Sequence, residues 1–460
     1  MISHCTGPHL NSTPQHGDCP SDRHREARPK PGSATDAGEQ KNTMAAIARF
    51  GTRVVPEKDQ IIRECRDGKQ LVHGPHIEAF EQEFARFLGA GHVRTCSTEY
   101  GRMALYFILK AMDFPPDAEI IVPALTFWVV PEIARVAGLK VVFADIDPTT
   151  FTLCPKAMAR AITPNTRAVL PTHLYGMACD LDPILDLART HNLKVVEDCA
   201  HSLGATYKGQ MVGTHGDASF FSFQAFKPLN TYGGGLAWMR DADLARRVGA
   251  FADAEAWPTE KRVDSILSAG HWQHTFIRPK VFTYSLFPVW WAASWVNAKP
   301  EERLWEKVRP LDPLPEHYRG RFTNVQAALG RAGLARLPEF IERTRRHART
   351  LDQMLGDVPG VTIPLIPPGR THVYYQYCPY VPNYRALVKR CIRRGVDVAP
   401  MHVDICTRME LFGWKGSPAP GAEKAATAVQ VPVYESLSDR EIERVGRLVR
   451  AQVQKTASAT

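Results

Sequence analysis

Residues 222–235 read SFQAFKPLNTYGGG, and this stretch decides which fold can be expected. Lys227 follows an apolar run and precedes three consecutive glycines, Gly233 to Gly235. Upstream, residues 195–204 read VVEDCAHSLG, in which Asp198 comes directly after apolar residues typical of a short buried strand. The chain therefore offers a carboxylate at a predicted strand end and an amine farther along.

This pair of groups suits pyridoxal 5'-phosphate (PLP). A lysine amine can bond to the aldehyde carbon of PLP, and a carboxylate can keep the pyridine nitrogen protonated so that the ring accepts electrons. We predict a PLP site with Lys227 and Asp198 as its catalytic residues. No metal site is predicted, because the ten cysteines contain no pair at CxxC spacing.

Apolar runs and helical stretches alternate around this pair. Buried strands are predicted at 120–122, 141–143, 168–170 and 194–196. Helical stretches such as 102–112 and 182–191 separate them. The alternation predicts an α/β fold with a large, mostly parallel sheet covered by helices on both faces, which binds ligands at the carboxyl ends of its strands.

The chain is predicted to have four parts. Residues 1–45 form a disordered N-terminal tail and residues 46–250 a large PLP-binding domain. Residues 251–318 form an aromatic-rich insertion, and residues 319–455 an interface helix with a small C-terminal α/β domain. The tail is polar, rich in Pro, Gly, Ser and His, and has no apolar segment typical of a signal peptide. The small domain is expected to hold strands near 372–381 and 395–401.

Further cofactor-binding candidates lie in the large domain. Gly101 and Arg102 open a helix whose free N–H groups and dipole suit a phosphate, and Ser222 offers a hydroxyl. Phe127 can stack on a cofactor ring, and His201 can contact its phenolic oxygen. Each residue alone also has a structural interpretation: a capped helix, a structural serine, a core aromatic or a core histidine.

Taken together, these segments resemble the DegT/DnrJ/EryC1/StrS family of PLP-dependent sugar aminotransferases. The motifs appear in one order along most of the chain: Gly74-Pro75, 101–105, 121–127, 145–148, 173–176, 197–201, 216–223, Lys227, 233–235 and 323–330. The resemblance implies a type I fold like that of aspartate aminotransferase, and a homodimer with active sites at the subunit interface. It also implies transfer of an amino group, usually from glutamate, to a nucleotide- or lipid-linked keto sugar in glycan or natural-product biosynthesis.

The resemblance assigns a role to each candidate. Lys227 would carry the cofactor and move protons, and Asp198 would pair with the pyridine nitrogen. Phe127 would stack on the ring and His201 would lie near its hydroxyl, while Ser222, Gly101 and Arg102 would hold the phosphate. Arg319 falls where many members place an asparagine that reaches the partner subunit's cofactor phosphate. Two alternatives are a sugar dehydratase, which commonly has histidine in place of Lys227, and a non-catalytic regulatory relative, which need not keep Lys227 and Asp198.

Residues 281–296 read VFTYSLFPVWWAASWV, between Arg278 and Lys280 on one side and Lys299, Arg303, Lys307 and Arg309 on the other. The run is too short to span a bilayer, and Pro288 interrupts it. Tryptophans with basic flanks suit contact with a membrane interface. Burial against the partner subunit or against the same chain is the other interpretation.

The net charge is +9, and residues 1–43 contribute none of it. A basic body suits a phosphate-bearing ligand or an anionic membrane, although a solvated basic surface gives the same count. No nucleic-acid-binding motif is present, so no nucleic-acid partner is expected. The scattered cysteines favour a reducing compartment. We therefore expect a cytoplasmic protein, peripheral at the inner membrane face if 281–296 binds lipid.

Overall fold

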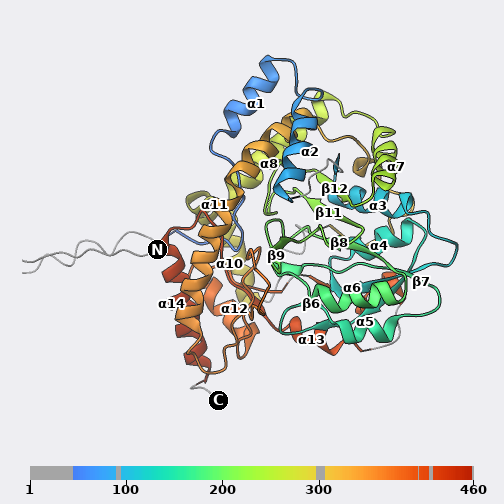
Figure 1. Cartoon of the computed structure of the whole chain (residues 1–460). Coiled ribbons are helices and arrows are strands. Elements are labelled where there is room, and N and C mark those ends of the chain that lie inside the picture. The colour runs from blue at the N-terminus through green and yellow to red at the C-terminus, as the bar shows by residue number, and fades with distance from the viewer. Residues whose placement is uncertain (1–44, 90–94, 297–305, 402, 414–417, 458–460) are drawn as a thin grey trace, which may run out of the picture. The chain divides into compact units, whose positions relative to one another are not determined.

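A seven-stranded sheet lies at the centre of the part of the chain that the structure describes (Figure 1). This computed structural model describes residues 45–89, 95–296, 306–401, 403–413 and 418–457, so the predicted tail lies almost wholly outside it. The strands are β1 Thr95–Thr98, β2 Glu119–Pro123, β4 Lys140–Ala144, β7 Thr166–Val169, β8 Lys194–Asp198, β11 Ala218–Ser222 and β12 Gly235–Met239. Their order is β1-β12-β11-β8-β7-β2-β4, and in this described sheet only β12 runs opposite to the others.

Helices cover both faces of the sheet, as predicted. They are α2 His76–Phe87, α3 Gly101–Ala111, α4 Val129–Val136, α5 Pro155–Ala161, α6 Leu181–Thr190 and α7 Ala242–Asp253. A further helix, α1 Lys58–Asp67, packs in a separate apolar cluster with Val325 and Leu329. In β2, Ile120 and Val122 join the apolar cluster of α3, α4 and α7, whereas Ile121 joins the cluster of α2, α5 and α6. Burial on both faces explains why these strands read as continuous apolar runs.

A long helix, α11 Asn324–Leu355, begins at a capping box in which Thr323 and Gln326 exchange hydrogen bonds. It packs with α12 Tyr384–Ile392 and α14 Asp439–Ala457 around a separate apolar cluster. This cluster supports the predicted division into a large and a small domain, which stays a prediction. The described chain also contains shorter elements, among them β3 Leu125–Thr126, β5 Ile146–Asp147, β6 Thr152–Leu153, β9 Thr206–Tyr207, β10 Gln210–Met211, β13 Ala399–Pro400, β14 Asp404–Ile405, β15 Val429–Gln430 and α13 Pro420–Ala425.

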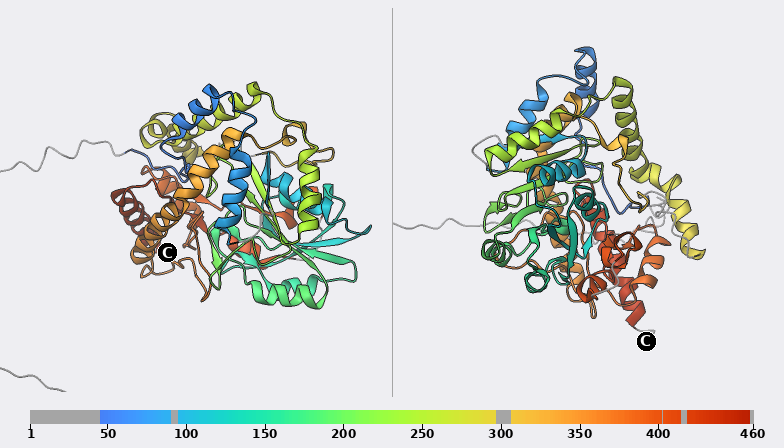
Figure 2. Two further views of the ribbon diagram at one scale, coloured as in Figure 1. Left: turned by 45° about the horizontal axis from the view of Figure 1, so that its top comes forward. Right: turned by 90° about the vertical axis from the view of Figure 1, so that its right-hand side faces the viewer.

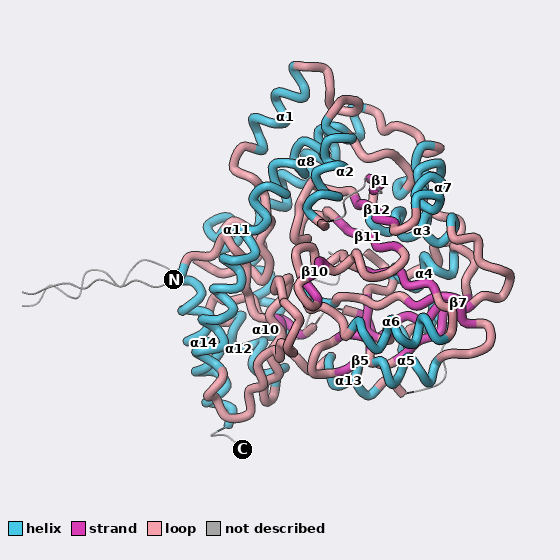
Figure 3. The backbone as a smooth tube through the Cα atoms, viewed as in Figure 1, coloured by secondary structure: helices cyan, strands magenta, loops and turns pink. Residues whose placement is uncertain are grey.

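The C-terminal part contains less strand than the sequence predicts, and Figure 3 shows it as mainly helix and loop. Along 372–381 the described chain forms only isolated bridges, such as Tyr377 with Val431. Tyr374 has a φ of 50°, which breaks an extended run, and Pro379 has no N–H to donate to a ladder. The predicted strand at 395–401 is reduced to β13.

The described part of the predicted insertion includes the helices α8 Glu260–Ile277, α9 Pro279–Tyr284 and α10 Phe287–Val296. Phe282 of α9 is buried with Ala46 and Ala48, so this part of the insertion packs on the start of the described chain. Trp290 is also buried, whereas Trp291 and Trp295 are exposed. Lys299 and Arg303, two of the predicted basic flanks, lie outside the described residues. No helix in the described part of the chain is both long and apolar enough to cross a membrane.

Candidate active site

A cavity of about 1180 Å³ opens at the carboxyl ends of the central strands. It is lined by every predicted site residue except Arg319: Gly101, Arg102, Phe127, Asp198, His201, Ser222 and Lys227. The loops after β7, β8 and β11 and the start of α3 supply one side, and the insertion and the C-terminal part supply the other. The fold thus gathers groups that are more than a hundred residues apart in the sequence.

Asp198, at the end of β8, is buried and firmly oriented. Its Oδ1 accepts a hydrogen bond of 3.0 Å from the Ala200 N–H, and the Thr172 hydroxyl lies 3.5 Å from Oδ2. Burial raises the pKa of the carboxyl, while the Ala200 N–H and the charge of Lys227 act in the opposite direction. Sequence reasoning missed Thr172 as a site residue, although it directly precedes the His173–Gly176 motif at the end of the neighbouring strand.

Lys227 lies in the loop between β11 and β12 and is half-buried. Burial lowers the pKa of its amine to about 8, and Arg102 lowers it further while Asp198 opposes the shift. At that pKa roughly a tenth of the amine is uncharged at pH 7, far more than for an ordinary lysine. Its Nζ lies 5.1 Å from the centre of the Tyr375 ring. Tyr375, to which sequence reasoning gave no site role, therefore helps to position the amine.

The start of α3 is pressed against the sheet. A Cβ added to Gly235 would lie only 2.3 Å from the Cα and N atoms of Gly101, and a Cβ on Gly101 would lie 2.7 Å from the Phe221 carbonyl oxygen. Both positions therefore require glycine. The first turn of α3 has no acidic residue, so its N-terminal dipole is not offset from within the helix. The helix start and Ser222 together form a cradle suited to a phosphate.

Arg102 is engaged with the far side of the cavity. It donates a 2.6 Å hydrogen bond to Glu306, and its guanidinium lies 4.3 Å from the centre of the Tyr318 ring. Burial acts to raise the pKa of Glu306, but the charge of Arg102 and the Tyr318 hydroxyl outweigh it and hold the pKa below its ordinary value. To make its predicted phosphate contact, the Arg102 guanidinium would have to bind the phosphate and Glu306 at the same time.

Aromatic rings line the middle of the cavity. Phe127, directly after β3, is half-buried and meets Trp128 edge to face at a centroid distance of 6.1 Å. The rings of His201 and Tyr375 are stacked, with centroids 4.1 Å apart and an angle of 21° between their planes. These rings leave an apolar wall beside Asp198 and Lys227, which suits a flat cofactor.

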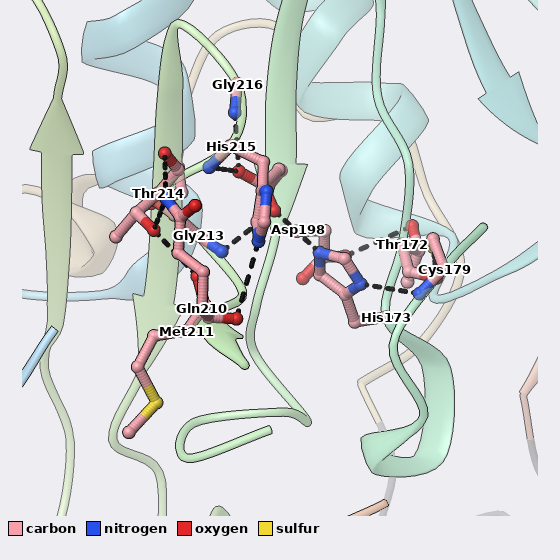
Figure 4. A network of polar contacts seen from close by, with 12 residues as sticks. Thr172, His173, Cys179, Asp198, Gln210, Met211, Gly213, Thr214, His215 and Gly216 are labelled. Atoms are coloured by element: carbon pink, nitrogen blue, oxygen red, sulfur yellow. Dashed lines mark hydrogen bonds and ion pairs between the residues drawn. The ribbon is translucent and has the colours of Figure 1, made fainter. Parts of the chain in front are cut away.

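A buried hydrogen-bond network fixes the strand ends behind the cavity (Figure 4). Glu197 accepts hydrogen bonds from the backbone N–H groups of Gly213, His215 and Gly216, and from Nε2 of His173 at 3.0 Å. The Cys179 N–H donates to Nδ1 of His173, which leaves the proton on Nε2. Burial acts to raise the pKa of Glu197, but the hydrogen bonds from His173 and from the Gly216 N–H help to outweigh it and hold the pKa below its ordinary value.

The same network contains a group of potential metal ligands within the described chain, His173, Glu197 and Cys199. Both oxygens of Glu197 are already occupied by two hydrogen bonds each. We therefore interpret the group as structural. The backbone N–H of His173 also donates to the Asp198 carbonyl at 3.1 Å, so the network holds the catalytic strand end in place.

Replacing Glu197 with glutamine should destabilise the fold by about 3 kcal/mol or more, because an amide NH₂ would face backbone donors and leave them unpaired. Urea unfolding followed by circular dichroism measures this loss. Glu342→Gln is the control: it breaks the exposed ion pair with Arg349 and should cost less than about 1 kcal/mol. Equal effects of the two variants would contradict the structural role of Glu197.

Arg319 does not line this cavity, although His317 and Tyr318 directly before it do. Its side chain is exposed and forms a two-pronged contact with Glu255, with Nε–O and Nη2–O distances of 3.0 to 3.1 Å. An exposed position outside the chain's own cavity is what a residue serving a neighbouring subunit requires. Its contact with a partner's cofactor stays a prediction.

Residues 53–263 and 295–450 match the model of the DegT/DnrJ/EryC1/StrS aminotransferase family. The chain belongs to this family. It is 31% identical to the spore coat polysaccharide biosynthesis protein SpsC of Bacillus subtilis over 413 residues, 86% of this chain and 94% of that protein. It is 32% identical to the GDP-perosamine synthase of Caulobacter vibrioides over 323 residues, 70% of this chain and 73% of that protein.

A solved structure confirms the predicted fold. The aminotransferase TlmJ from Streptoalloteichus hindustanus superposes with a TM-score of 0.73 at 27% identity, covering 89% of this chain and all of TlmJ. The family membership and the aminotransferase class predicted from the sequence are likewise confirmed. The family match leaves out residues 264–294, which lie inside the predicted insertion and contain most of α8, all of α9 and most of α10.

Proposed function

We propose that this aminotransferase uses PLP to move an amino group from glutamate to a keto sugar, nucleotide- or lipid-linked, in glycan or natural-product biosynthesis. The observation that carries the proposal is the meeting of Lys227 and Asp198 in one cavity with an uncapped helix start. The relatives support the substrate class, since one is named as a GDP-perosamine synthase and another as a polysaccharide biosynthesis protein.

The cavity residues fit PLP. Lys227 supplies the amine for its aldehyde, Asp198 the carboxylate for its pyridine nitrogen, and Phe127 an aromatic face. The start of α3 at Gly101 and the Ser222 hydroxyl provide donors for its phosphate, and glycine at Gly101 and Gly235 lets this helix start pack directly on the sheet. Bound there, PLP would supply a ring that accepts the electron pair left on a substrate carbon when its proton is removed.

The protein's own part in the reaction is proton transfer and electrostatics. Lys227 Nζ takes a proton from the substrate carbon in one half of the reaction and returns a proton to the substrate carbon in the other half. Accepting a proton requires an uncharged amine, which burial favours. Asp198, fixed by Ala200 and Thr172, presents a carboxylate without having to reorient. The Tyr375 ring limits where the lysine chain can lie.

A panel of nucleotide-linked and lipid-linked keto sugars, incubated with glutamate and read by mass spectrometry, tests the proposed function. The expected product has the ketone oxygen exchanged for an amino group, with 2-oxoglutarate formed in equal amount. Loss of water without gain of nitrogen would indicate the dehydratase instead. If no sugar in the panel and no amino donor reacts with PLP-loaded enzyme, the proposal fails.

We further propose that the active unit is a homodimer located in the cytoplasm, with Arg319 completing the partner's site. Mixing the inactive variants Lys227→Ala and Arg319→Ala under conditions of subunit exchange should restore up to about a quarter of wild-type activity, because some dimers then hold one intact site. The control mixture is Lys227→Ala with Asp198→Asn, whose lesions both lie in the same subunit's cavity, so each site of a mixed dimer carries one lesion and no activity should return. If the Arg319 mixture regains no more activity than this control, Arg319 serves its own subunit's site.

A further inference from the structure

The helix α10 is apolar on every side: residues 287–296 contain no charged side chain. A helix of this kind is normally buried in a protein core or in lipid. Yet only one side of α10 packs against the described chain, where Trp290 and Ala293 are buried. Val289, Trp291 and Trp295 are exposed, with 52%, 44% and 57% of their surfaces accessible.

The exposed apolar surface continues onto the neighbouring helices. Trp272 and Phe276 of α8 are exposed and stacked on each other at 5.6 Å, and Tyr284 ends α9 with 78% of its surface accessible. Figure 2 (right) shows α8 to α10 running down one edge of the ribbon, from yellow-green to yellow. We call the exposed side chains of this edge the aromatic edge: Trp272, Phe276, Tyr284, Val289, Trp291 and Trp295.

The body of the protein holds this edge in place. Arg393, directly after α12, donates to the Ser294 carbonyl at 2.9 Å, and its guanidinium lies 3.6 Å from the centre of the Trp295 ring. The Thr283 hydroxyl accepts a 2.7 Å hydrogen bond from the Ala46 N–H. The inner side of α10 lines the active-site cavity through Trp290, Ala293 and Ser294. The helix is therefore fixed, with one side toward the cavity and the other toward solvent.

The charges of the residues around α10 indicate which partner covers its exposed side. From Ser265 to Val296 there is no acidic residue, and Arg278, between α8 and α9, and Lys280, in the first turn of α9, are both exposed. Cations beside tryptophan and tyrosine suit the headgroup region of an anionic bilayer. A second copy is less suited, because residues 264–294 are not part of the family's common body. With ten residues, α10 is too short to span lipid but can lie in its interface.

We propose that the aromatic edge docks on anionic lipid membranes, with α10 in the plane of the interface and Arg278 and Lys280 against lipid phosphates. Docking of this kind combines burial of the apolar side chains with electrostatic attraction. The active-site cavity then lies directly behind the lipid-facing helix.

Co-sedimentation of the full-length protein with vesicles tests this docking. We expect binding to phosphatidylcholine vesicles containing about a quarter phosphatidylglycerol, and several-fold weaker binding to phosphatidylcholine alone. Raising the salt should weaken binding without abolishing it, because only the charged part is screened. Absence of binding to the anionic vesicles at low salt would overturn the proposal.

Two variants and two matched controls separate the apolar contribution to vesicle binding from the electrostatic contribution. Trp272→Gln with Val289→Gln and Trp291→Gln should reduce vesicle partitioning at least ~10-fold, and Arg278→Gln with Lys280→Gln should remove the preference for anionic lipid. Leu365→Gln with Ile366→Gln changes exposed apolar residues outside the edge, and Lys110→Gln with Lys156→Gln removes two exposed cations elsewhere. Both controls should bind like wild type. Equal losses in variants and controls would overturn the proposal.

Light scattering without vesicles decides between lipid and a second copy. The aromatic-edge variant should keep the mass and the circular dichroism spectrum of wild type. A halved mass would show that another copy covers the edge, and would overturn the lipid assignment. Vesicle binding requires neither substrate nor turnover, so its failure would leave the proposed aminotransferase function untouched.

Discussion

Replacement of Lys227 by alanine is expected to lower kcat by at least ~10³-fold, because the variant lacks both the amine that bonds to the cofactor and the group that moves the proton. The half-buried position of Lys227 and its pKa of about 8 make it the amine suited to both tasks. Borohydride reduction of PLP-loaded protein, followed by peptide mass spectrometry, should find the cofactor on Lys227 in wild type and on no residue in the variant.

Two other lysines of the same cavity, Lys307 and Lys389, provide the control. Lys307→Ala and Lys389→Ala should keep the borohydride adduct at Lys227, whatever they do to substrate affinity. An adduct that persists in Lys227→Ala, or that maps to Lys307 or Lys389 in wild type, would refute the assignment of the catalytic lysine.

Asp198→Asn should lower kcat at least ~100-fold while leaving the protein folded, since a neutral amide cannot hold a proton on the pyridine nitrogen. Asparagine has the same shape and can still accept from the Ala200 N–H, so the strand end should keep its conformation. Stopped-flow absorbance of the glutamate half-reaction measures the effect separately from the sugar. A half-reaction within a few-fold of wild type would remove the role given to Asp198.

A matched carboxylate change shows whether this loss is specific. Asp217, at the opposite end of the strand pair, accepts from the Val195 N–H at 2.9 Å and pairs with the exposed Lys194. Asp217→Asn keeps the acceptor and lies away from the cavity, so its half-reaction should stay within ~2-fold of wild type.

Four parallel strands of the described sheet, β2, β4, β7 and β8, were predictable because they are mostly buried, whereas β1, β11 and β12 were not predicted as strands. Such strands are short apolar runs, and in β2 and β8 the structure extends the predicted runs by only one or two residues. The positions of Asp198 and Lys227 followed from the same pattern, since a residue just after a buried strand must lie at the sheet's ligand-binding edge. The interface helix predicted in 319–455 corresponds to α11, which begins at Asn324.

Other features depend on contacts between distant segments, which no local pattern encodes. The pairing of Arg102 with Glu306 joins a helix start to a residue 204 positions away. The sequence run 281–296 indicated three equivalent tryptophans, but Trp290 is buried beside the cavity while Trp291 and Trp295 are exposed. That division depends on where α12 and the start of the described chain pack against α10.

The contact between Gly101 and Gly235 has a consequence for tolerance to mutation. Neither glycine has a side chain that could react, yet a side chain at Gly235 would press on the start of α3, and one at Gly101 would press on Phe221 and Ser222 of β11. In a saturation library selected for activity, both sites should therefore reject even alanine, as completely as a catalytic position would. Intolerance at these two positions would arise because the backbone of α3 directly contacts the backbone of the sheet, which leaves no room for a side chain.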